Sequence, residues 1–229
     1  MARIPSPTRP APARVRHARG ALLGALLALA AAWSGVARGA DDGPRAARDV
    51  TESADLANEL LGHPARAWTF TRWLDGRPLT LEGLRGKVVL VRWFTNGCRF
   101  CGNTLPGLEA LRKRYAPQGL VVVGVYHPKP PRAVSDGDVR RMSRKLGFHG
   151  PVAVDEDWRT LNRWWLANHP ERNWTSVSFL VDREGVVRWA HGGGEYHASA
   201  DPRHAACDAR HAELERTIQR LLGEPAAAR

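Results

Sequence analysis

Apolar residues fall into two kinds of run in the middle of the chain. Residues 88–94 and 120–125 form short, almost wholly apolar runs, which are typical of strands buried on both faces of a sheet. Between them, leucines and a tyrosine recur at helical spacing over residues 105–115, and Pro106 predicts a kink near the start of that helix. A strand, a helix and a strand at this spacing predict a right-handed crossover that joins two parallel strands.

Shorter patterns predict the rest of a mixed α/β domain. Residues 68–74 alternate between apolar and polar, residues 75–78 favour a turn and residues 79–81 resume the pattern, so we expect a small N-terminal β-hairpin. Further helices are expected at 135–146, 158–165 and 205–222, and further strands at 151–155, 177–181 and 186–189. The last two strands form a second hairpin around the turn at 182–185. The domain is expected to span residues 63–223, followed by a tail at 224–229.

The first 40 residues have the pattern of a secretory signal. Five arginines and no acids occur in residues 1–20, alanine and leucine dominate residues 21–33, and small residues follow. The apolar run is short for a membrane span, but an uncleaved anchor stays open as an alternative. Either outcome predicts an exported, periplasmic protein, with membrane contact only if the leader is retained. Residues 41–62 are expected to be a peripheral linker that ends in a short helix.

The high positive charge belongs in part to this leader. Removing residues 1–40 takes away six arginines and no acids, which lowers the formal net charge from +11 to +5. The remaining basic residues are interspersed with acids and form no basic stripe with stacking aromatics, so we expect no nucleic-acid partner.

The chain contains three cysteines, and two of them form a Cys-x-x-C motif. Cys98 and Cys101 stand directly after an apolar run and directly before a predicted helix, where the helix dipole favours a thiolate. A zinc site would need a second pair of ligands at similar spacing, so redox chemistry is favoured. Cys98, nearer the helix start, is expected to attack and Cys101 to resolve, with no cofactor.

The residues around the motif resemble a known family. The run 87–94, the motif itself, Pro106 and the run 119–125 resemble thioredoxin-like proteins of the TlpA and ResA type, within the redoxin (AhpC/TSA-like) class. Residues 193–196 are most similar to the thioredoxin-like domain of DipZ-type proteins. The resemblance implies a three-layer α/β/α fold with a central mixed sheet. It also implies an exported thiol–disulfide oxidoreductase of the kind that serves cytochrome c maturation or disulfide repair.

Two positions depart from the family pattern. The family's cis-proline loop, which faces the dithiol, has Ser176 in place of proline here, preceded by Thr175. A cis bond before serine costs several kcal/mol more than before proline, so we expect a trans bond and an altered substrate groove, with changed partner choice or lost activity. The buried acid of thioredoxins is replaced by Arg92, and His127 follows the next strand where some relatives have an acid.

These replacements predict a shifted redox potential. Cations instead of carboxylates beside the dithiol should lower the pKa of the attacking thiol and stabilise the reduced form. Arg92 and His127 would then make the pair more oxidising than thioredoxin, whose potential is about −270 mV. The alternative is that the Arg92 guanidinium reaches the surface and never meets the sulfurs.

A second group of candidate ligands lies in the last predicted helix. His204, Cys207 and His211 have the spacing i, i+3 and i+7, which places them on one helical face, with His191, His197 and Asp208 nearby in the sequence. Such residues are plausible ligands for copper or zinc. The alternatives are an exposed polar insertion whose cysteine packs against the domain, or an intermolecular or regulatory disulfide through Cys207. The sequence leaves these alternatives open.

We therefore expect an exported oxidoreductase that exchanges its Cys98–Cys101 disulfide with protein thiols, with a membrane protein as a candidate electron donor. A thiol peroxidase, in which Cys98 forms a sulfenic acid, is one alternative. A metal-binding or metallochaperone module is another. Four tryptophans that lie beyond the dithiol in sequence are interpreted as core packing; they are Trp158, Trp164, Trp165 and Trp174.

Overall fold

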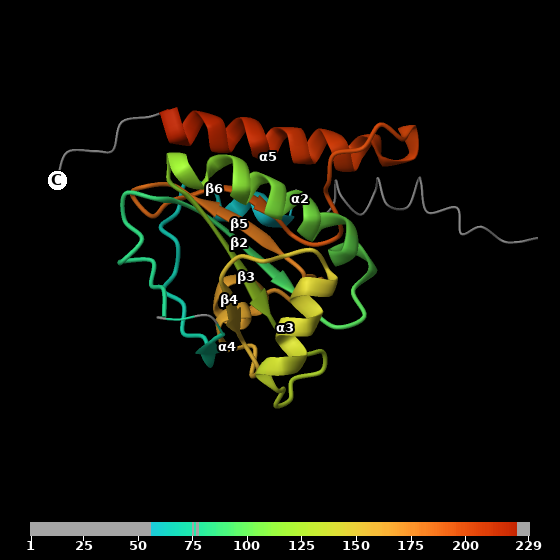
Figure 1. The fold of residues 1–229 in the computed structure, drawn as a ribbon. Coiled ribbons are helices and arrows are strands. Elements are labelled where there is room, and N and C mark those ends of the chain that lie inside the picture. The colour runs from blue at the N-terminus through green and yellow to red at the C-terminus, as the bar shows by residue number, and fades with distance from the viewer. Residues whose placement is uncertain (1–55, 75, 77, 224–229) are drawn as a thin grey trace, which may run out of the picture. The chain divides into compact units, whose positions relative to one another are not determined.

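A six-stranded mixed sheet organises the computed structural model, which describes residues 56–74, 76 and 78–223 (Figure 1). The strand order is β1-β4-β3-β2-β5-β6. The strands are β1 (Arg72–Trp73), β2 (Val88–Phe94), β3 (Leu120–Tyr126), β4 (Val152–Val154), β5 (Ser178–Val181) and β6 (Val187–His191). The predicted leader, the tail and the first part of the predicted linker lie outside the described residues.

The strand pairings agree with the predicted crossover and the predicted C-terminal hairpin. β2 pairs in parallel with β3 over its full length, and β3 pairs in parallel with β4. On its other side β2 pairs antiparallel with β5, which forms an antiparallel hairpin with β6. The central strand β2 is therefore buried in the middle of the sheet, as its apolar sequence predicts.

The helices are α2 (Arg99–Tyr115), α3 (Asp136–Lys145), α4 (Arg159–Leu161) and α5 (Ala205–Gly223). Single turns add η1 (Asn58–Leu60), η2 (Ala116–Gln118), the π-helical η3 (Asn162–Leu166) and η4 (Pro202–His204). The predicted helix at 158–165 is thus a short α-helical turn that continues as a π-helical turn. Helix α2 is continuous through Pro106. Among the described helices, none is both long and apolar enough to cross a membrane.

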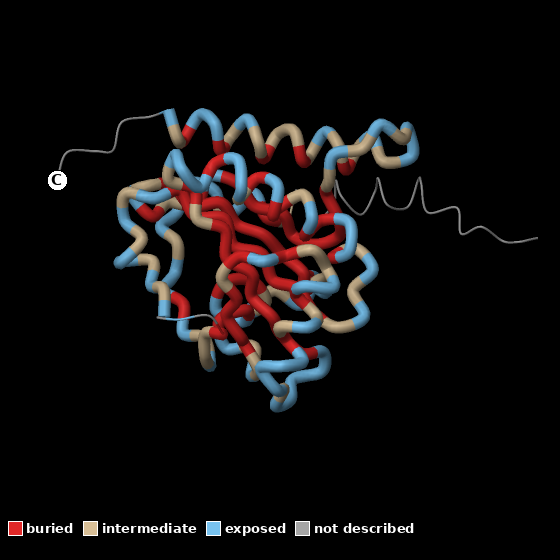
Figure 2. The backbone as a smooth tube through the Cα atoms, in the orientation of Figure 1, coloured by how far each residue is buried: buried red, intermediate tan, exposed pale blue. Residues whose placement is uncertain are grey.

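Side chains of the sheet alternate between two core clusters, one on each face. On one face, Leu90 belongs to the same cluster as Leu108 of α2 and Ile218 of α5. On the other face, Val91 belongs to a cluster with Trp164 of η3. Figure 1 shows α2 and α5 side by side above the sheet, and Figure 2 shows that the buried residues follow the strands. This arrangement confirms the predicted α/β/α layers.

The predicted N-terminal hairpin is wrong. The two residues of β1 pair antiparallel with β4, and residues 79–81 form no strand. Instead, Trp68 Nε1 donates a 2.7 Å hydrogen bond to the Leu79 carbonyl, and the Trp68 ring stacks on Trp164. The aromatic residues of this segment pack in the cluster that contains Trp164, whereas Leu74 belongs to the cluster on the other face of the sheet.

The described part of the predicted linker is also not peripheral. Ala57 is fully buried, and the Leu56 carbonyl accepts a 3.1 Å hydrogen bond from Arg172 Nη2. The Gly62 N–H donates to the Val187 carbonyl at 2.9 Å. These residues therefore pack on the core, and they pair with the first residue of β6 and with the turn before it.

Candidate active site

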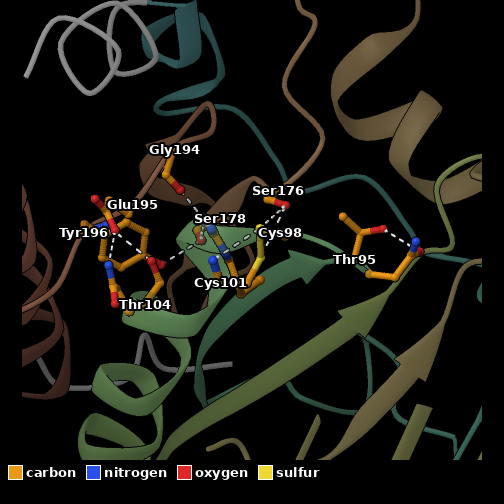
Figure 3. The surroundings of a disulfide bond; sticks show 12 residues. Thr95, Cys98, Cys101, Thr104, Ser176, Ser178, Gly194, Glu195 and Tyr196 are labelled. Carbon is orange, nitrogen blue, oxygen red and sulfur yellow. Dashed lines mark hydrogen bonds between the residues drawn. A yellow bond between two sulfur atoms is a disulfide. The ribbon is translucent and has the colours of Figure 1, made fainter. Parts of the chain in front are cut away.

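The two motif cysteines form a disulfide at the start of α2, just after the end of β2 (Figure 3). Their Cα atoms are 5.4 Å apart. Cys98 is the N-cap residue of α2 and is half-buried, whereas Cys101, one turn into the helix, is fully buried. An attacking thiol from another molecule can therefore reach Cys98 more easily than Cys101.

Cys98 Sγ accepts a hydrogen bond from the helix start. The Cys101 N–H lies 3.2 Å from Cys98 Sγ and also makes a 3.2 Å contact with the Cys98 carbonyl. The first N–H groups of a helix have no partner within it, and the positive end of the helix dipole points at this position. Both effects favour a negative charge on Cys98 Sγ once the disulfide is opened.

Ser176 faces the disulfide. Its Oγ lies 3.4 Å from Cys98 Sγ and 3.5 Å from Cys101 Sγ, and both Ser176 and Thr175 are buried. The one cis peptide bond among the described residues is Lys129–Pro130, so the Thr175–Ser176 bond is trans, as expected. A hydroxyl thus occupies a position beside the sulfurs where proline, which has no side-chain donor, stands in the family.

Arg92 is fully buried, so the alternative in which its guanidinium reaches the surface is wrong. Its Nη2 donates to the Gly194 carbonyl at 3.0 Å, its Nη1 donates to Ser178 Oγ at 3.3 Å, and it lies over the ring of Tyr196. Burial lowers the pKa of Arg92, although the nearby Tyr196 and Glu195 oppose this shift. No carboxylate among the described residues forms an ion pair with Arg92.

Several residues around Arg92 were not singled out as site residues from the sequence. Ser178 Oγ and Tyr196 Oη lie 2.7 Å apart, and the Tyr196 N–H donates to Thr104 Oγ1 of α2 at 3.3 Å. The pairing of β2 with β5 could have pointed to Ser178, because it lies directly opposite Arg92 in the sheet. Figure 3 shows this polar network next to the disulfide, on the side of the Tyr196 loop.

His127 is buried without a partner for its side chain. Neither ring nitrogen has a hydrogen-bond partner, and the ring packs edge-on against Trp158. Burial lowers the pKa of His127 to about 3, and the positive charges of Lys129 and Arg92 act in the same direction. His127 is therefore a neutral imidazole at neutral pH, which leaves Arg92 as the cation of the predicted pair.

One of the four tryptophans lies next to the dithiol. The ring centroids of Trp174 and Phe100, which stands between the two cysteines, are 5.6 Å apart, and both side chains are half-buried. By contrast, Trp164 and Trp165 are buried against Phe179, as the packing interpretation expects. The exposed parts of Phe100 and Trp174 offer an apolar surface beside the disulfide.

The predicted ligand group on the last helix loses His211 and is joined by Glu195 and His197. His204 and Cys207 lie together with Glu195 and His197, whereas His211 is outside this group. His204 ends the 3₁₀ turn η4, so the α-helical spacing to His211 does not apply. The His211 ring instead packs beside α2, where its Nε2 would lie 3.5 Å from a Cβ added at Gly107.

Cys207 is a free thiol and is buried. Burial, with a smaller effect of the Glu195 charge, raises the pKa of Cys207 to about 11. An uncharged, buried thiol is a poor nucleophile and is out of reach of another protein, so this geometry does not favour the predicted intermolecular disulfide.

Comparison with known proteins identifies the family of this chain. The model of the AhpC/TSA family matches residues 61–190, more than half of the chain. The chain belongs to the AhpC/TSA family. Membership confirms the predicted redoxin resemblance, and the matched residues include the disulfide, Arg92 and Ser176.

Curated relatives include proteins of the DipZ and ResA types. Protein DipZ of Mycobacterium bovis is 31% identical over 152 residues, which are 65% of this chain and 20% of DipZ. Thiol-disulfide oxidoreductase ResA of Bacillus thuringiensis is 24% identical over 134 residues, which are 58% of this chain and 70% of ResA. The chain thus spans about a fifth of the length of the DipZ proteins it matches. The name of ResA agrees with the enzyme class that the sequence predicts, a thiol–disulfide oxidoreductase.

Solved structures confirm the thioredoxin-like fold. A putative protein disulfide isomerase from Bacteroides thetaiotaomicron has a TM-score of 0.56 at 22% identity, covering 72% of this chain and 91% of that one. A putative thiol:disulfide interchange protein DsbE from Chlorobium tepidum has a TM-score of 0.53 at 23% identity, covering 71% and 98%. At this level of identity the likeness concerns the fold alone.

Proposed function

We propose that the protein is an exported thiol–disulfide oxidoreductase that exchanges its Cys98–Cys101 disulfide with protein thiols. The observation that carries this proposal is the asymmetry of the pair. Cys98 Sγ is half-buried at a helix start and accepts the Cys101 N–H, while Cys101 is fully buried behind it. This arrangement gives one attackable sulfur and one protected resolving sulfur.

The exchange proceeds in two displacements. A substrate thiolate attacks Cys98 Sγ, a mixed disulfide forms, and the Cys98–Cys101 bond breaks with Cys101 leaving as a thiolate that takes up a proton. A second substrate thiolate then attacks the substrate sulfur of the mixed disulfide, and Cys98 leaves as a thiolate. The substrate dithiol is oxidised by two electrons and the protein pair is reduced by two. The reverse sequence reduces a substrate disulfide.

The groups around the sulfurs support the oxidising direction. The helix start and the Ser176 hydroxyl both contact Cys98 Sγ and favour the thiolate of the reduced pair over the neutral disulfide. The buried charge of Arg92, whose guanidinium binds Ser178 and Gly194, would act in the same direction. Stabilising the reduced form raises the reduction potential, so we place it above the thioredoxin value of about −270 mV. Phe100 and Trp174 supply an apolar docking surface for the partner.

Trapping tests the proposal directly. In the reverse sequence the Cys98 thiolate attacks a substrate disulfide, and Cys101 resolves the mixed disulfide that forms. The variant C101S removes this resolving thiol, so expression in the native compartment should leave partner proteins joined to Cys98, to be released by reductant and identified by mass spectrometry. The matched control is C98S, which retains only the buried Cys101 of the pair and should trap little. An empty C101S trap, or equal trapping by both variants, would overturn the proposal.

Two further measurements separate the alternatives. Export is supported by the leader pattern of residues 1–40, and recovery of the protein from the cytoplasm with an intact N-terminus would contradict it. A thiol peroxidase needs Cys98 for peroxide but not Cys101 for the first turnover. Rapid peroxide consumption by C101S would therefore favour the thiol peroxidase over the proposed exchange function. Recovery of a membrane protein in the C101S trap would identify the electron donor.

A further inference from the structure

Four metal-ligating side chains converge on one point at the start of α5. They are Glu195 and His197 from the loop after β6, His204 at the end of η4, and Cys207 in the first turn of α5. One ligand atom from each lies within 4.8 Å of those of the other three. This is the one group of its kind found among the described residues, and it does not include either motif cysteine.

The two histidine ligand atoms of this cluster lack hydrogen-bond partners. His197 Nε2 and His204 Nδ1 are buried and accept or donate no hydrogen bond. The same two nitrogens lie 3.8 Å and 3.7 Å from the two carboxylate oxygens of Glu195. Cys207 is free and only 1% exposed. Buried polar atoms without partners are costly, and a cation between them would satisfy all four residues at once.

Neighbouring groups hold the ligands in the orientation that coordination needs. His197 Nδ1 lies 3.2 Å from the Ala198 carbonyl, so it carries the proton and leaves the Nε2 lone pair free. Asn103 Nδ2 donates a 2.6 Å hydrogen bond to Glu195 Oε2 and thereby fixes the carboxylate. Such second-layer contacts are typical of metal centres.

We propose that Glu195, His197, His204 and Cys207 bind one Zn²⁺ ion. Two imidazole nitrogens, one thiolate and one carboxylate are ligands that zinc takes in tetrahedral sites. Zinc bonds of about 2.0–2.3 Å would place the ligand atoms about 3.3–3.6 Å apart, so the side chains close by about 1 Å around the ion. The Cys207 thiol loses its proton to solvent when the Zn–S bond forms.

The zinc site is independent of the proposed exchange function, because it uses none of the residues of the dithiol. It would fix the loop after β6 to the start of α5 and, through Asn103, to the helix that carries the cysteine motif, which is distant in the sequence. Its role on this geometry is structural, since all four positions of a tetrahedral ion are occupied by protein ligands.

The test uses the full chain with both motif cysteines replaced, C98S/C101S, so that the dithiol cannot bind metal. We expect one zinc per chain by atomic emission after dialysis, and a fall in Tm on treatment with a chelator. C207S and H204Q in this background should lose the zinc, and Co²⁺ loaded in place of zinc should show a thiolate-to-cobalt charge-transfer band that C207S lacks. Replacing the supporting Asn103 by alanine should weaken zinc binding about 10–100-fold.

The matched control is H211Q, which changes a histidine of the same helix outside the cluster and should keep both the zinc and the cobalt band. Circular dichroism identifies any variant that fails to fold. If C207S or H204Q does not fold, the near-isosteric variant E195Q tests the loss of a zinc ligand in its place. Absence of zinc from the C98S/C101S protein, or zinc retained by C207S, E195Q and H204Q alike, would overturn the site. Binding of copper with no zinc would overturn the identity of the ion. Because the dithiol is absent from this protein, failure here leaves the trapping result untouched.

Discussion

The hydroxyl of Ser176 is the group whose removal most directly tests how the dithiol is tuned. Its Oγ lies 3.4 Å and 3.5 Å from the two sulfurs and is shielded from solvent. A disulfide sulfur has no hydrogen, so the hydroxyl donates to a neutral acceptor in the oxidised pair and to a thiolate in the reduced pair. A hydrogen bond is worth about 1 kcal/mol to a neutral group and about 1.5–3 kcal/mol to a charged one.

The variant S176A therefore destabilises the reduced form more than the oxidised form. The difference of about 0.5–2 kcal/mol corresponds to a fall of about 10–40 mV in the reduction potential, since 30 mV equals about 1.4 kcal/mol for two electrons. The potential is measured at pH 7 by equilibration with reduced and oxidised glutathione, followed by mass tagging of free Cys98 and Cys101. S176T keeps the hydroxyl and should stay close to the wild-type potential.

S143A is the matched control for losing a buried serine. The Ser143 hydroxyl donates to the Phe148 carbonyl at 2.8 Å and makes no contact with the disulfide. Its removal should lower stability but leave the potential unchanged. A potential that rises in S176A, or that moves equally in S143A, would refute the reasoning.

Three other side chains separate the effects of charge, burial and docking. R92M keeps a long apolar side chain and removes the charge, so the glutathione equilibrium should show a lower potential; an unchanged value would mean that Arg92 does not act on the sulfurs. H127F removes a base whose folded pKa is about 3. Below its ordinary pKa of 6.5 the unfolded chain takes up a proton that the folded chain excludes, so wild-type stability falls by about 1.4 kcal/mol per pH unit between 6.5 and 3. Urea unfolding should show H127F gaining about 2 kcal/mol relative to wild type between pH 7 and pH 5, and parallel pH profiles would contradict this. W174A should slow exchange with a protein thiol more than exchange with glutathione, and equal losses in stopped-flow assays would argue against docking at Trp174.

The central strands and the cysteine pair could be predicted because their signals are local. Strand β2 is buried on both faces, so its sequence is a continuous apolar run that needs no knowledge of its neighbours. The motif cysteines are three residues apart and meet across one helical turn. Ser176 could be placed opposite them through the family resemblance, although it is 75 residues beyond Cys101.

The remaining site features depend on contacts that no local pattern records. Residues 68–74 alternate like a hairpin strand, but their aromatic residues pack in the cluster that contains Trp164, and β1 pairs with β4 instead. The burial of Arg92 depends on the loop that carries Gly194, 102 residues away in sequence. His211 matched the helical spacing and Glu195 did not, yet Glu195 lies with Cys207 because the loop after β6 folds back on the start of α5.

The pairing of residues 62–65 with the start of β6 also bears on aggregation. An uncovered edge strand presents unpaired N–H and C=O groups to which another chain can add a strand, and natural proteins protect such edges. Here the Gly62 N–H and the His63 carbonyl both pair with Val187, and Pro64 forms a bridge with Val186. At the opposite edge, β1 is only two residues long. The segment at 62–65 thus blocks strand addition at the start of β6, and the short β1 offers little edge for another chain to pair with.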